Sequence, residues 1–488
     1  MKTKYSTYLG SATLSALLLL SLFFYKERTV FVDLAYHLFS ILALDSFAIQ
    51  NYRIASFFTQ LFPLLGGKAG LSLNTIALAY SASFVLLPII TFFTINNMLR
   101  NSRIAITYLL FVILMTTHTF YWTQSELPQA TAFLFIFFAL LDNALQMENI
   151  PWSHILLGSI LLIISSFSHP LLVIPFVFVI SFYFISYPNQ KLLLITSGLF
   201  YLLSYATRSI FFKTPYESNA MGGLNNIFTL FPNYFSIQSN INLLQYFYHD
   251  YYFVVLLLIG VTFFYIKTKS YLKLFITLAW FFGYCFIINI SFPNGGDQFY
   301  LENQYLLLSI IVGFPFVFDL LPTIKTLQIQ LAILSIICLV GVSRVYNTHQ
   351  PYTQRLSWNR DLLKKTDNLI QQKIICTAPF AAPKELLTTW GTSYELWLLS
   401  TLETGRSRSV VIEEQPGEFD WALPATHSFI VKWGNFPYAV LKPQYFNFSD
   451  TTAYVKLRYT DWLNHSFINL FFCLYSPTFP SITTLHNV

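Results

Sequence analysis

The stretch that decides the fold runs from Lys26 to Asn74 and reads KERTVFVDLAYHLFSILALDSFAIQNYRIASFFTQLFPLLGGKAGLSLN. It follows the apolar run 8–25, which we interpret as a retained first membrane span because no small-residue cleavage site comes after it. The stretch is too polar to cross a bilayer and too apolar to be a free loop. It therefore predicts an amphipathic outer loop at the membrane surface. If the part around Asp33 is helical, Asp33 and His37 lie one turn apart on the same face, where they either take part in chemistry or are solvated surface residues.

The composition places most of the chain in a membrane. Of the 488 residues, 55% are hydrophobic and only 10% are charged, whereas a soluble domain carries about 25% charged residues. Residues 344–488 hold 24 charged side chains in 145 positions, against 26 in the 343 positions before them. The contrast predicts a transmembrane domain over 1–343 and a second domain over 344–488. The net charge of +6 is spread over both parts, so a nucleic-acid partner is not expected.

Apolar runs long enough for helices predict an all-α polytopic domain with about eleven transmembrane helices. The expected spans are 8–25, 76–96, 104–122, 130–145, 155–167, 171–187, 192–205, 251–266, 274–292, 305–321 and 327–342. Lys and Arg concentrate in the short loops on one side, which favours a cytoplasmic N-terminus in a cytoplasmic or inner membrane. Eleven spans then place the C-terminal domain outside, together with the long segments 26–75, 206–250 and 293–304.

The C-terminal part alternates short elements and predicts a small α/β or α+β extracytoplasmic domain. We expect strands at 373–378, 409–413, 428–433, 453–459 and 467–475, and a helix at 393–403. A disulfide between Cys376 and Cys473 is compatible with this location, but the spacing alone does not establish it.

Three charged or titratable residues mark the outer ends of expected spans. Glu126 lies in a tight turn (YWTQSELPQA), where it either contacts a substrate or caps the next helix. His169 precedes Pro170 and either reaches a phosphate or has a structural role. Arg208 suits a lipid-linked phosphate, and snorkelling to the interface is the alternative. Asp45 and Arg53, by contrast, are expected to be surface residues.

A further group of candidates precedes the tenth expected span, in PNGGDQFYLENQY. Asp297, Glu302 and Tyr305 either face an outer cavity that binds substrate or cap a helix. The sequence contains no dinucleotide, P-loop, zinc-protease or nucleophile-elbow motif and no metal-type cysteine cluster. No cofactor follows from these motifs, and whether a divalent cation takes part is left open.

This layout resembles the polytopic GT-C glycosyltransferases, in particular protein mannosyltransferase-like and aminoarabinose transferase-like enzymes. The motifs that carry the resemblance are Asp33 in VFVDLAYH, Glu126 in TQSELPQ, the SHP at 168–170 and DQFYLENQYLLL from Asp297 onward. Two departures stand out: Leu34 follows Asp33 where many members have a second acid, and Gln304 precedes Tyr305 where an Arg-Tyr pair is expected.

The resemblance implies an inverting transfer of a sugar from a polyprenyl-phosphate donor at the extracytoplasmic face. Carried over, Asp33 is the base or acceptor binder, Glu126 the second acid, and Arg208 and His169 face the donor phosphate, with His37 nearby. The acceptor, whether glycan, lipid or protein, stays open. The alternatives are a transporter, a polysaccharide polymerase or ligase, and a scaffold without activity. Asp142 and Asp319 argue against ion coupling because they lie near span ends.

Overall fold

The computed structural model describes residues 3–123, 126–215, 217, 222–367, 373–377 and 388–457. The chain divides into two compact units, Met1–Ser357 and Trp358–Val488. This division falls inside α19 (His349–Asp367), whereas the expected boundary near Arg344 lies inside the preceding helix α18 (Leu327–Asn347).

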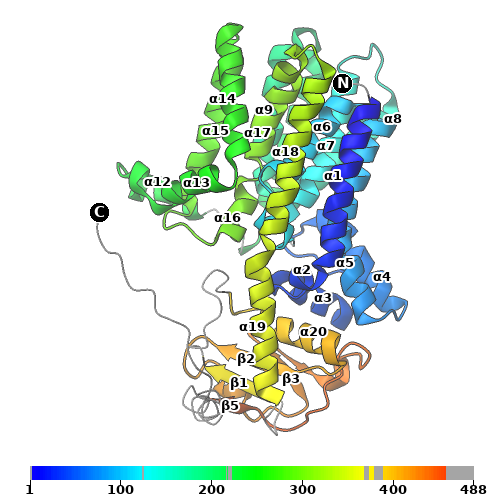
Figure 1. The fold of residues 1–488 in the computed structure, drawn as a ribbon, viewed down its shortest axis with the longest axis vertical. Helices are drawn as coiled ribbons and strands as arrows, with labels where there is room; N and C mark the ends of the chain where they lie inside the picture. Colours follow the sequence, from blue (N-terminus) through cyan, green and yellow to red (C-terminus); the bar gives the residue numbers. More distant parts are fainter. Residues whose placement is uncertain are drawn as a thin grey trace, which may run out of the picture. The chain divides into compact units, whose positions relative to one another are not determined.

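The first unit is helical (Figure 1). Its N-terminal half contains α1 (Thr3–Phe23), α2 (Tyr25–Thr29), α3 (Val32–Leu44), α4 (Phe57–Lys68), α5 (Leu73–Phe93), α6 (Ser102–Leu114), α7 (Glu126–Ala144) and α8 (Trp152–Ser168). Its C-terminal half contains α9 (Val173–Ser186), α10 (Lys191–Phe211), α12 (Asn226–Thr229), α13 (Gln238–His249), α14 (Tyr252–Lys267), α15 (Tyr271–Ser291), α16 (Gln298–Tyr305), α17 (Leu308–Pro315) and α18. The expected amphipathic stretch after the first span thus forms α2, α3 and α4.

Fewer helices than the eleven expected are long and apolar enough to cross a membrane. In the described residues six qualify, or up to eight if each of two bent pairs forms one span. The six are Thr3–Phe23, Leu73–Met98, Glu126–Ala144, Tyr271–Ser291, Gln298–Thr323 and Leu327–Thr366. Several long apolar helices of this kind indicate a multi-pass membrane protein.

Chain breaks and short helices explain the overcount. The run 155–167 forms α8, which has only 17 residues. The expected span 104–122 ends as α6 at Leu114, and the following residues fold into a turn around a short helix, His118–Phe120. The runs 171–187 and 192–205 belong to a pair of helices bent by 117° at Pro188. Proline disfavours the helical conformation in the residue before it, and Tyr187 accordingly leaves that conformation at φ −126°, ψ 72°.

Close helix packing holds the first unit together. The helix α7 packs against α5 and α8, and α1 packs against α5 and α18. Small residues permit these approaches. A Cβ added at Gly10 would lie 2.2 Å from the Phe92 ring, and one added at Gly341 would lie 2.3 Å from Cγ1 of Ile113.

The two acids expected near span ends are neutralised by ion pairs. Asp142 lies 3.3 Å from Arg103 and also accepts from Asn101 at 2.8 Å. Asp319 pairs with Lys273 at 2.9 Å. Each of the two acids therefore has a cationic partner from a different helix or loop.

The second unit contains a parallel sheet with strand order β2-β1-β5. Its strands are β1 (Lys373–Thr377), β2 (Ser409–Glu413) and β5 (Val455–Leu457), and α20 (Thr392–Thr404) lies between β1 and β2 in the chain. A helix in that position is the usual connection between parallel neighbours. A hairpin of β3 (Ser428–Val431) and β4 (Gly434–Pro437) completes the described elements.

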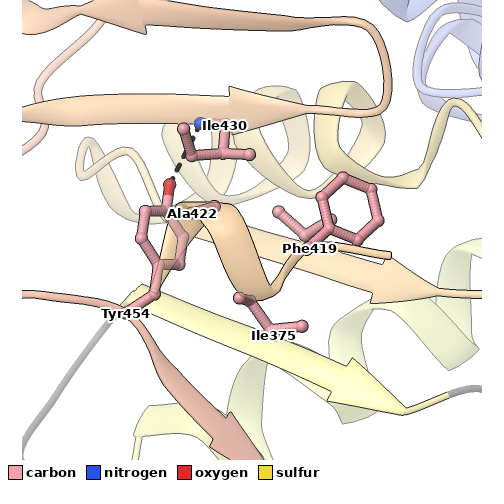
Figure 2. Close-up of a cluster of buried hydrophobic side chains, with 6 residues drawn as sticks. Ile375, Phe419, Ala422, Ile430 and Tyr454 are labelled. Atoms are coloured by element: carbon pink, nitrogen blue, oxygen red, sulfur yellow. Dashed lines mark hydrogen bonds between the residues drawn. The ribbon is translucent and has the colours of Figure 1, made fainter. Parts of the chain in front are cut away.

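A compact apolar cluster fills the space beside this sheet (Figure 2). Ile375 of β1, Phe419 and Ile430 are each no more than 2% exposed. The hydroxyl of Tyr454 accepts a hydrogen bond from the Ile430 amide at 3.0 Å, which ties the hairpin to the chain entering β5. The expected strands and the helix before residue 458 are therefore confirmed in place, with shifts at their ends. The expected strand 467–475 and Cys473 lie outside the described residues, whereas Cys376 is buried in β1.

Candidate functional site

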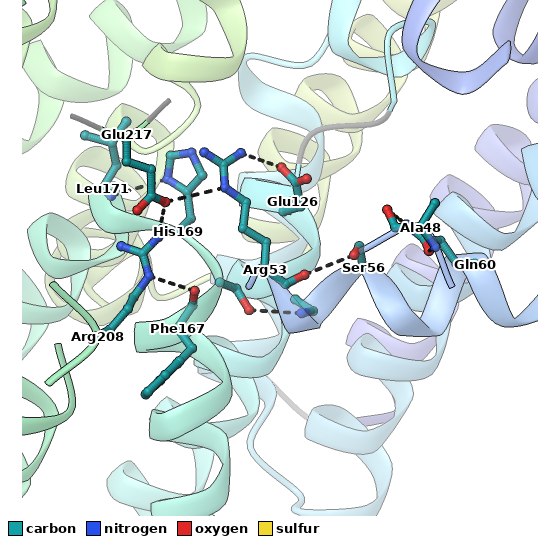
Figure 3. A network of polar contacts seen from close by, with 12 residues as sticks. Ala48, Arg53, Ser56, Gln60, Glu126, Phe167, His169, Leu171, Arg208 and Glu217 are labelled. Atoms are coloured by element: carbon teal, nitrogen blue, oxygen red, sulfur yellow. Dashed lines mark hydrogen bonds and ion pairs between the residues drawn. The ribbon is translucent and has the colours of Figure 1, made fainter. Parts of the chain in front are cut away.

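A polar network joins segments of the first unit that are far apart in the sequence (Figure 3). The Arg53 guanidinium donates through Nη1 to Oε2 of Glu126 at 2.8 Å, and its Nε lies 3.8 Å from Oε1 of Glu217. The same Glu217 oxygen accepts from Nη2 of Arg208. The Nε of Arg208 donates to the Phe167 carbonyl at 2.9 Å. Two cations and two carboxylates thus form one connected set, which we call the Arg53 network.

The Arg53 network is largely shielded from solvent. The side chains of Arg53 and Glu126 are 12% and 10% exposed, and those of Arg208 and Glu217 are 1% and 4% exposed. Burying charges is costly unless each has an opposite partner. Here the charges balance, so the set is neutral as a whole and any single change of charge leaves an uncompensated ion.

A tight loop delivers Arg53 to this position. Asn51 and Tyr52 both adopt left-handed backbone conformations, with φ of 51° and 57°. Two such residues in succession reverse the chain sharply, and the conformation is strained for a bulky side chain such as Tyr52. The amide of Ala55 then donates to Oγ of Ser168 at 3.0 Å, which fixes the loop to the end of α8.

Glu126 is the first residue of α7. A carboxylate in the first turn interacts favourably with the helix dipole, and this one also pairs with Arg53. These two interactions orient the side chain toward the loop that carries Arg53.

His169 lies in the break between α8 and the short helix Pro170–Leu172. Its extended backbone, at φ −153° and ψ 130°, follows from the proline after it. Its Nδ1 accepts from the Leu171 amide at 3.3 Å, so a neutral ring carries its proton on Nε2. Burial, then the nearby cations Arg53 and Arg208, lower the pKa of His169 well below its ordinary value. The ring is therefore neutral at pH 7 and offers an Nε2–H donor.

Asp33 occupies the first turn of α3 and is half-buried. Its carboxylate accepts a hydrogen bond from Nε1 of Trp122. Asp33 and Glu126 both interact electrostatically with Tyr80 of α5. The two acids predicted to be catalytic come from different helices, α3 and α7.

His37, a candidate for substrate binding from the sequence, is buried. It is 3% exposed and lies on the same helix as Asp33. Burial lowers the pKa of His37 to about 4, with a smaller opposing effect from the Ala48 backbone. The ring is neutral at pH 7 and therefore brings no positive charge to a phosphate.

Glu302 has a structural role that the sequence pattern did not indicate. Its side chain is fully buried and accepts from the amides of Thr117, His118 and Thr119 at 2.7, 3.1 and 2.8 Å. The hydroxyls of Thr117, Thr119 and Tyr251 also donate to it. A carboxylate with this many donors holds the turn after α6 in place and has little capacity left for a substrate.

Tyr305 and Asp297 also lie apart from the Arg53 network. The Tyr305 hydroxyl donates to Oδ1 of Asn289 and is buried, so it packs α16 against α15. Asp297 precedes α16 and is exposed. Neither shares a hydrogen bond or ion pair with the Arg53 network among the residues that the structure describes.

Two members of the Arg53 network were not predicted. The expectation that Arg53 is a surface residue is wrong, whereas Asp45 is indeed exposed. Arg53 is the only Lys or Arg between Arg28 and Lys68, and a lone cation in so apolar a stretch is a signal for a buried partner. Glu217 is likewise the only acid between Arg208 and Asp250.

Within the described ranges, no group of three or more His, Cys, Asp or Glu side chains is arranged to hold a metal ion. No protein-family model, curated protein or solved structure matches the chain. The functional argument therefore rests on the geometry of this molecule.

Proposed function

We propose that the chain is an integral-membrane glycosyltransferase of the GT-C type. It transfers a sugar from a polyprenyl-phosphate donor to an acceptor at the extracytoplasmic face, with inversion at the anomeric carbon. The observation that supports this most is the ion-paired set that joins Glu126 to Arg208 through Arg53 and Glu217, with the half-buried carboxylate of Asp33 as a further acid of the same unit. A transfer of this kind needs a base for the acceptor and cations for the leaving phosphate.

In the proposed reaction Asp33 acts as the general base. As the acceptor hydroxyl oxygen attacks the anomeric carbon, Asp33 takes the hydroxyl proton. The bond between that carbon and the phosphate oxygen breaks, and polyprenyl phosphate leaves with the electron pair. The Trp122 indole holds the Asp33 carboxylate through its N–H.

The donor phosphate is proposed to take the place of Glu217 as the partner of Arg208. Arginine suits this exchange because its planar fork binds carboxylate and phosphate oxygens alike. The Nε2–H of neutral His169 provides a second donor beside it. The expected consequence is that donor binding requires Glu217 to move.

The orientation of the chain is part of the proposal. The Lys and Arg bias of the short loops favours a cytoplasmic N-terminus. An odd number of spans then takes the second unit to the extracytoplasmic side, while an even number returns it to the cytoplasm. Accessibility tags after Gly70 and after Thr268 test this: the first must be reached from outside and the second from inside. A cytosolic tag at Gly70 contradicts the proposal.

The catalytic role of Asp33 is tested by Asp33→Asn. The matched control is Asp45→Asn, at the exposed acid that directly follows the end of α3. Membranes containing each variant are given labelled polyprenyl-phosphate sugars, and release of polyprenyl phosphate is measured. We expect loss of at least about 100-fold in Asp33→Asn, as for removal of a general base, and no loss in Asp45→Asn. Full activity of Asp33→Asn excludes Asp33 as the base. If the wild-type chain releases polyprenyl phosphate from none of the donors, the proposal that it is a glycosyltransferase is contradicted.

A further inference from the structure

A cavity of about 90 Å³ lies inside the first unit, apart from the ion pairs of the Arg53 network. Its lining includes Leu17 of α1, Pro88 of α5, Val112 of α6 and the polar residues Arg28, Thr123 and Gln129. A single water needs roughly 10–15 Å³ of such space. The cavity is therefore large enough for a group of several atoms, and its wall is mostly apolar.

Arg28 is the unusual element of this wall. It belongs to α2, and its residue is 1% exposed. Its guanidinium donates to Oγ of Ser81 at 2.8 Å, to the Ser81 carbonyl at 3.0 Å and to the Phe120 carbonyl. It also lies over the Phe120 ring, 4.1 Å from the ring centre. All these partners are neutral.

Arg28 therefore lacks a compensating charge. No carboxylate lies within ion-pair distance of it in the part of the chain that the structure describes. The ring contact replaces only part of the lost hydration. Burial lowers the pKa of Arg28 to about 9, which leaves it charged at pH 7. A buried, unpaired ion is costly, in contrast to Arg53 and Arg208, which both pair with acids.

The cavity wall also carries hydrogen-bonding groups that are not fully used. A guanidinium carries five N–H groups, and the three bonds above leave two for another partner. The hydroxyl of Thr123, also on the cavity wall, is buried and has no hydrogen-bond partner among the described residues. A ligand with two acceptor oxygens and negative charge satisfies both groups.

We propose that this cavity binds an amphipathic anion. Its carboxylate or phosphate head pairs with Arg28 and accepts from Thr123, and its alkyl chain lies against Leu17, Pro88 and Val112. The wall suits such a ligand, because it combines one uncompensated cation with side chains that are mostly apolar. This site is separate from the proposed transfer reaction and does not rest on it.

The test uses the full chain in discs of zwitterionic lipid and three probes of equal length: octanoate, octyl phosphate and octanol. Binding is measured by calorimetric titration below the micelle-forming concentrations. We expect the wild type to bind at least one of the two anions at least tenfold more tightly than octanol, the factor for one charge-assisted hydrogen bond of about 1.4 kcal/mol. A preference for octyl phosphate identifies a lipid phosphate head as the source, and a preference for octanoate identifies a fatty acid.

Three variants distinguish the effect of the Arg28 charge from the effect of the cavity volume. Arg28→Gln removes the preference for anions, and Val112→Phe fills the cavity and weakens all three probes at least tenfold. Lys68→Gln, which removes an exposed charge from the end of α4, leaves binding unchanged. The proposal is overturned if octanol binds as tightly as both anions, or if Val112→Phe binds them like the wild type. These two outcomes decide the matter even if Arg28→Gln does not fold.

Discussion

The guanidinium of Arg53 and the carboxylate of Glu126 lie 2.8 Å apart, although 73 residues separate them in the chain. This pair fixes the loop before α4 to the beginning of α7 in the first unit. Because Arg53 also approaches Glu217, the pair extends to Arg208 and brings the regions around residues 53, 126, 167 and 208 into one structure.

Replacing Glu126 by Gln should therefore destabilise the first unit. The change leaves Arg53 with only the more distant carboxylate of Glu217, at 3.8 Å, among the charged partners described. Breaking a fully buried pair costs about 3–5 kcal/mol, and because these side chains retain some exposure we expect about 1–3 kcal/mol. Unfolding in denaturant measures the loss. The exposed Glu148→Gln serves as control and should stay within about 0.5 kcal/mol; equal effects of both variants would argue against a structural role for the pair.

Glu302→Gln should have a larger effect. The amide would place an NH2 group against donors that now point at a carboxylate, including three backbone amides. Each unsatisfied buried donor costs about 1–3 kcal/mol, so a total loss of about 3 kcal/mol or more is expected. The comparison is Asp297→Asn, an exposed acid five residues earlier, which should be nearly neutral. A stable Glu302→Gln variant with unchanged unfolding would refute the assigned role.

His37 should make stability depend on pH. Its pKa is about 4 in the folded chain against 6.5 for the free side chain. Between these values the unfolded state binds the proton and the folded state does not, so stability falls as the pH falls below about 6.5. The loss reaches about 3 kcal/mol near pH 4. The unfolding free energy of the wild type minus that of His37→Phe should therefore fall by about 3 kcal/mol from pH 7 to pH 4. A constant difference over this range would contradict the prediction.

Gly341→Ala should weaken the packing of α18 against α6. The added methyl group would lie 2.3 Å from Cγ1 of Ile113 and 3.1 Å from the Ile113 carbonyl oxygen. Overpacking of this kind costs about 1–3 kcal/mol. Gly283→Ala in α15 is the matched control, because nothing lies within 4 Å of its added Cβ, and helix propensity there favours Ala by up to about 1 kcal/mol. Effects of the same sign and size would show that the close approach is unimportant.

Local patterns predicted much of this fold. Short-range periodicity predicted the amphipathic stretch after the first span, the strands at 409–413 and 428–433 and the helix at 393–403. The observed elements are 409–413, 428–431 and 392–404. Burial on one face and strand alternation are local properties, and the sequence carries them directly. The separation of the runs 155–167 and 171–187 around Pro170 was also predicted, and proline acts locally on the residue before it.

The overcount of spans and the missed site residues have a different cause. Hydropathy does not reveal that the residues after Leu114 turn away from the helix, because the turn is held by Glu302, far along the chain. Arg53 was misjudged for the same reason: its partners Glu126 and Glu217 become neighbours only in the folded unit. The isolation of Arg53 in an apolar stretch indicates that it has a partner, but a single sequence does not show which residue that partner is.

The bonds to Glu302 also set an order for assembly. The amides of Thr117, His118 and Thr119 find their acceptor 183 to 185 residues later in the chain. During synthesis from the N-terminus, the turn after α6 therefore waits for α16 to emerge before these groups acquire their final partner. The early helices are synthesised first, and Glu302 forms its hydrogen bonds with the turn after them only later. A chain interrupted before residue 302 therefore lacks the acceptor for these amides.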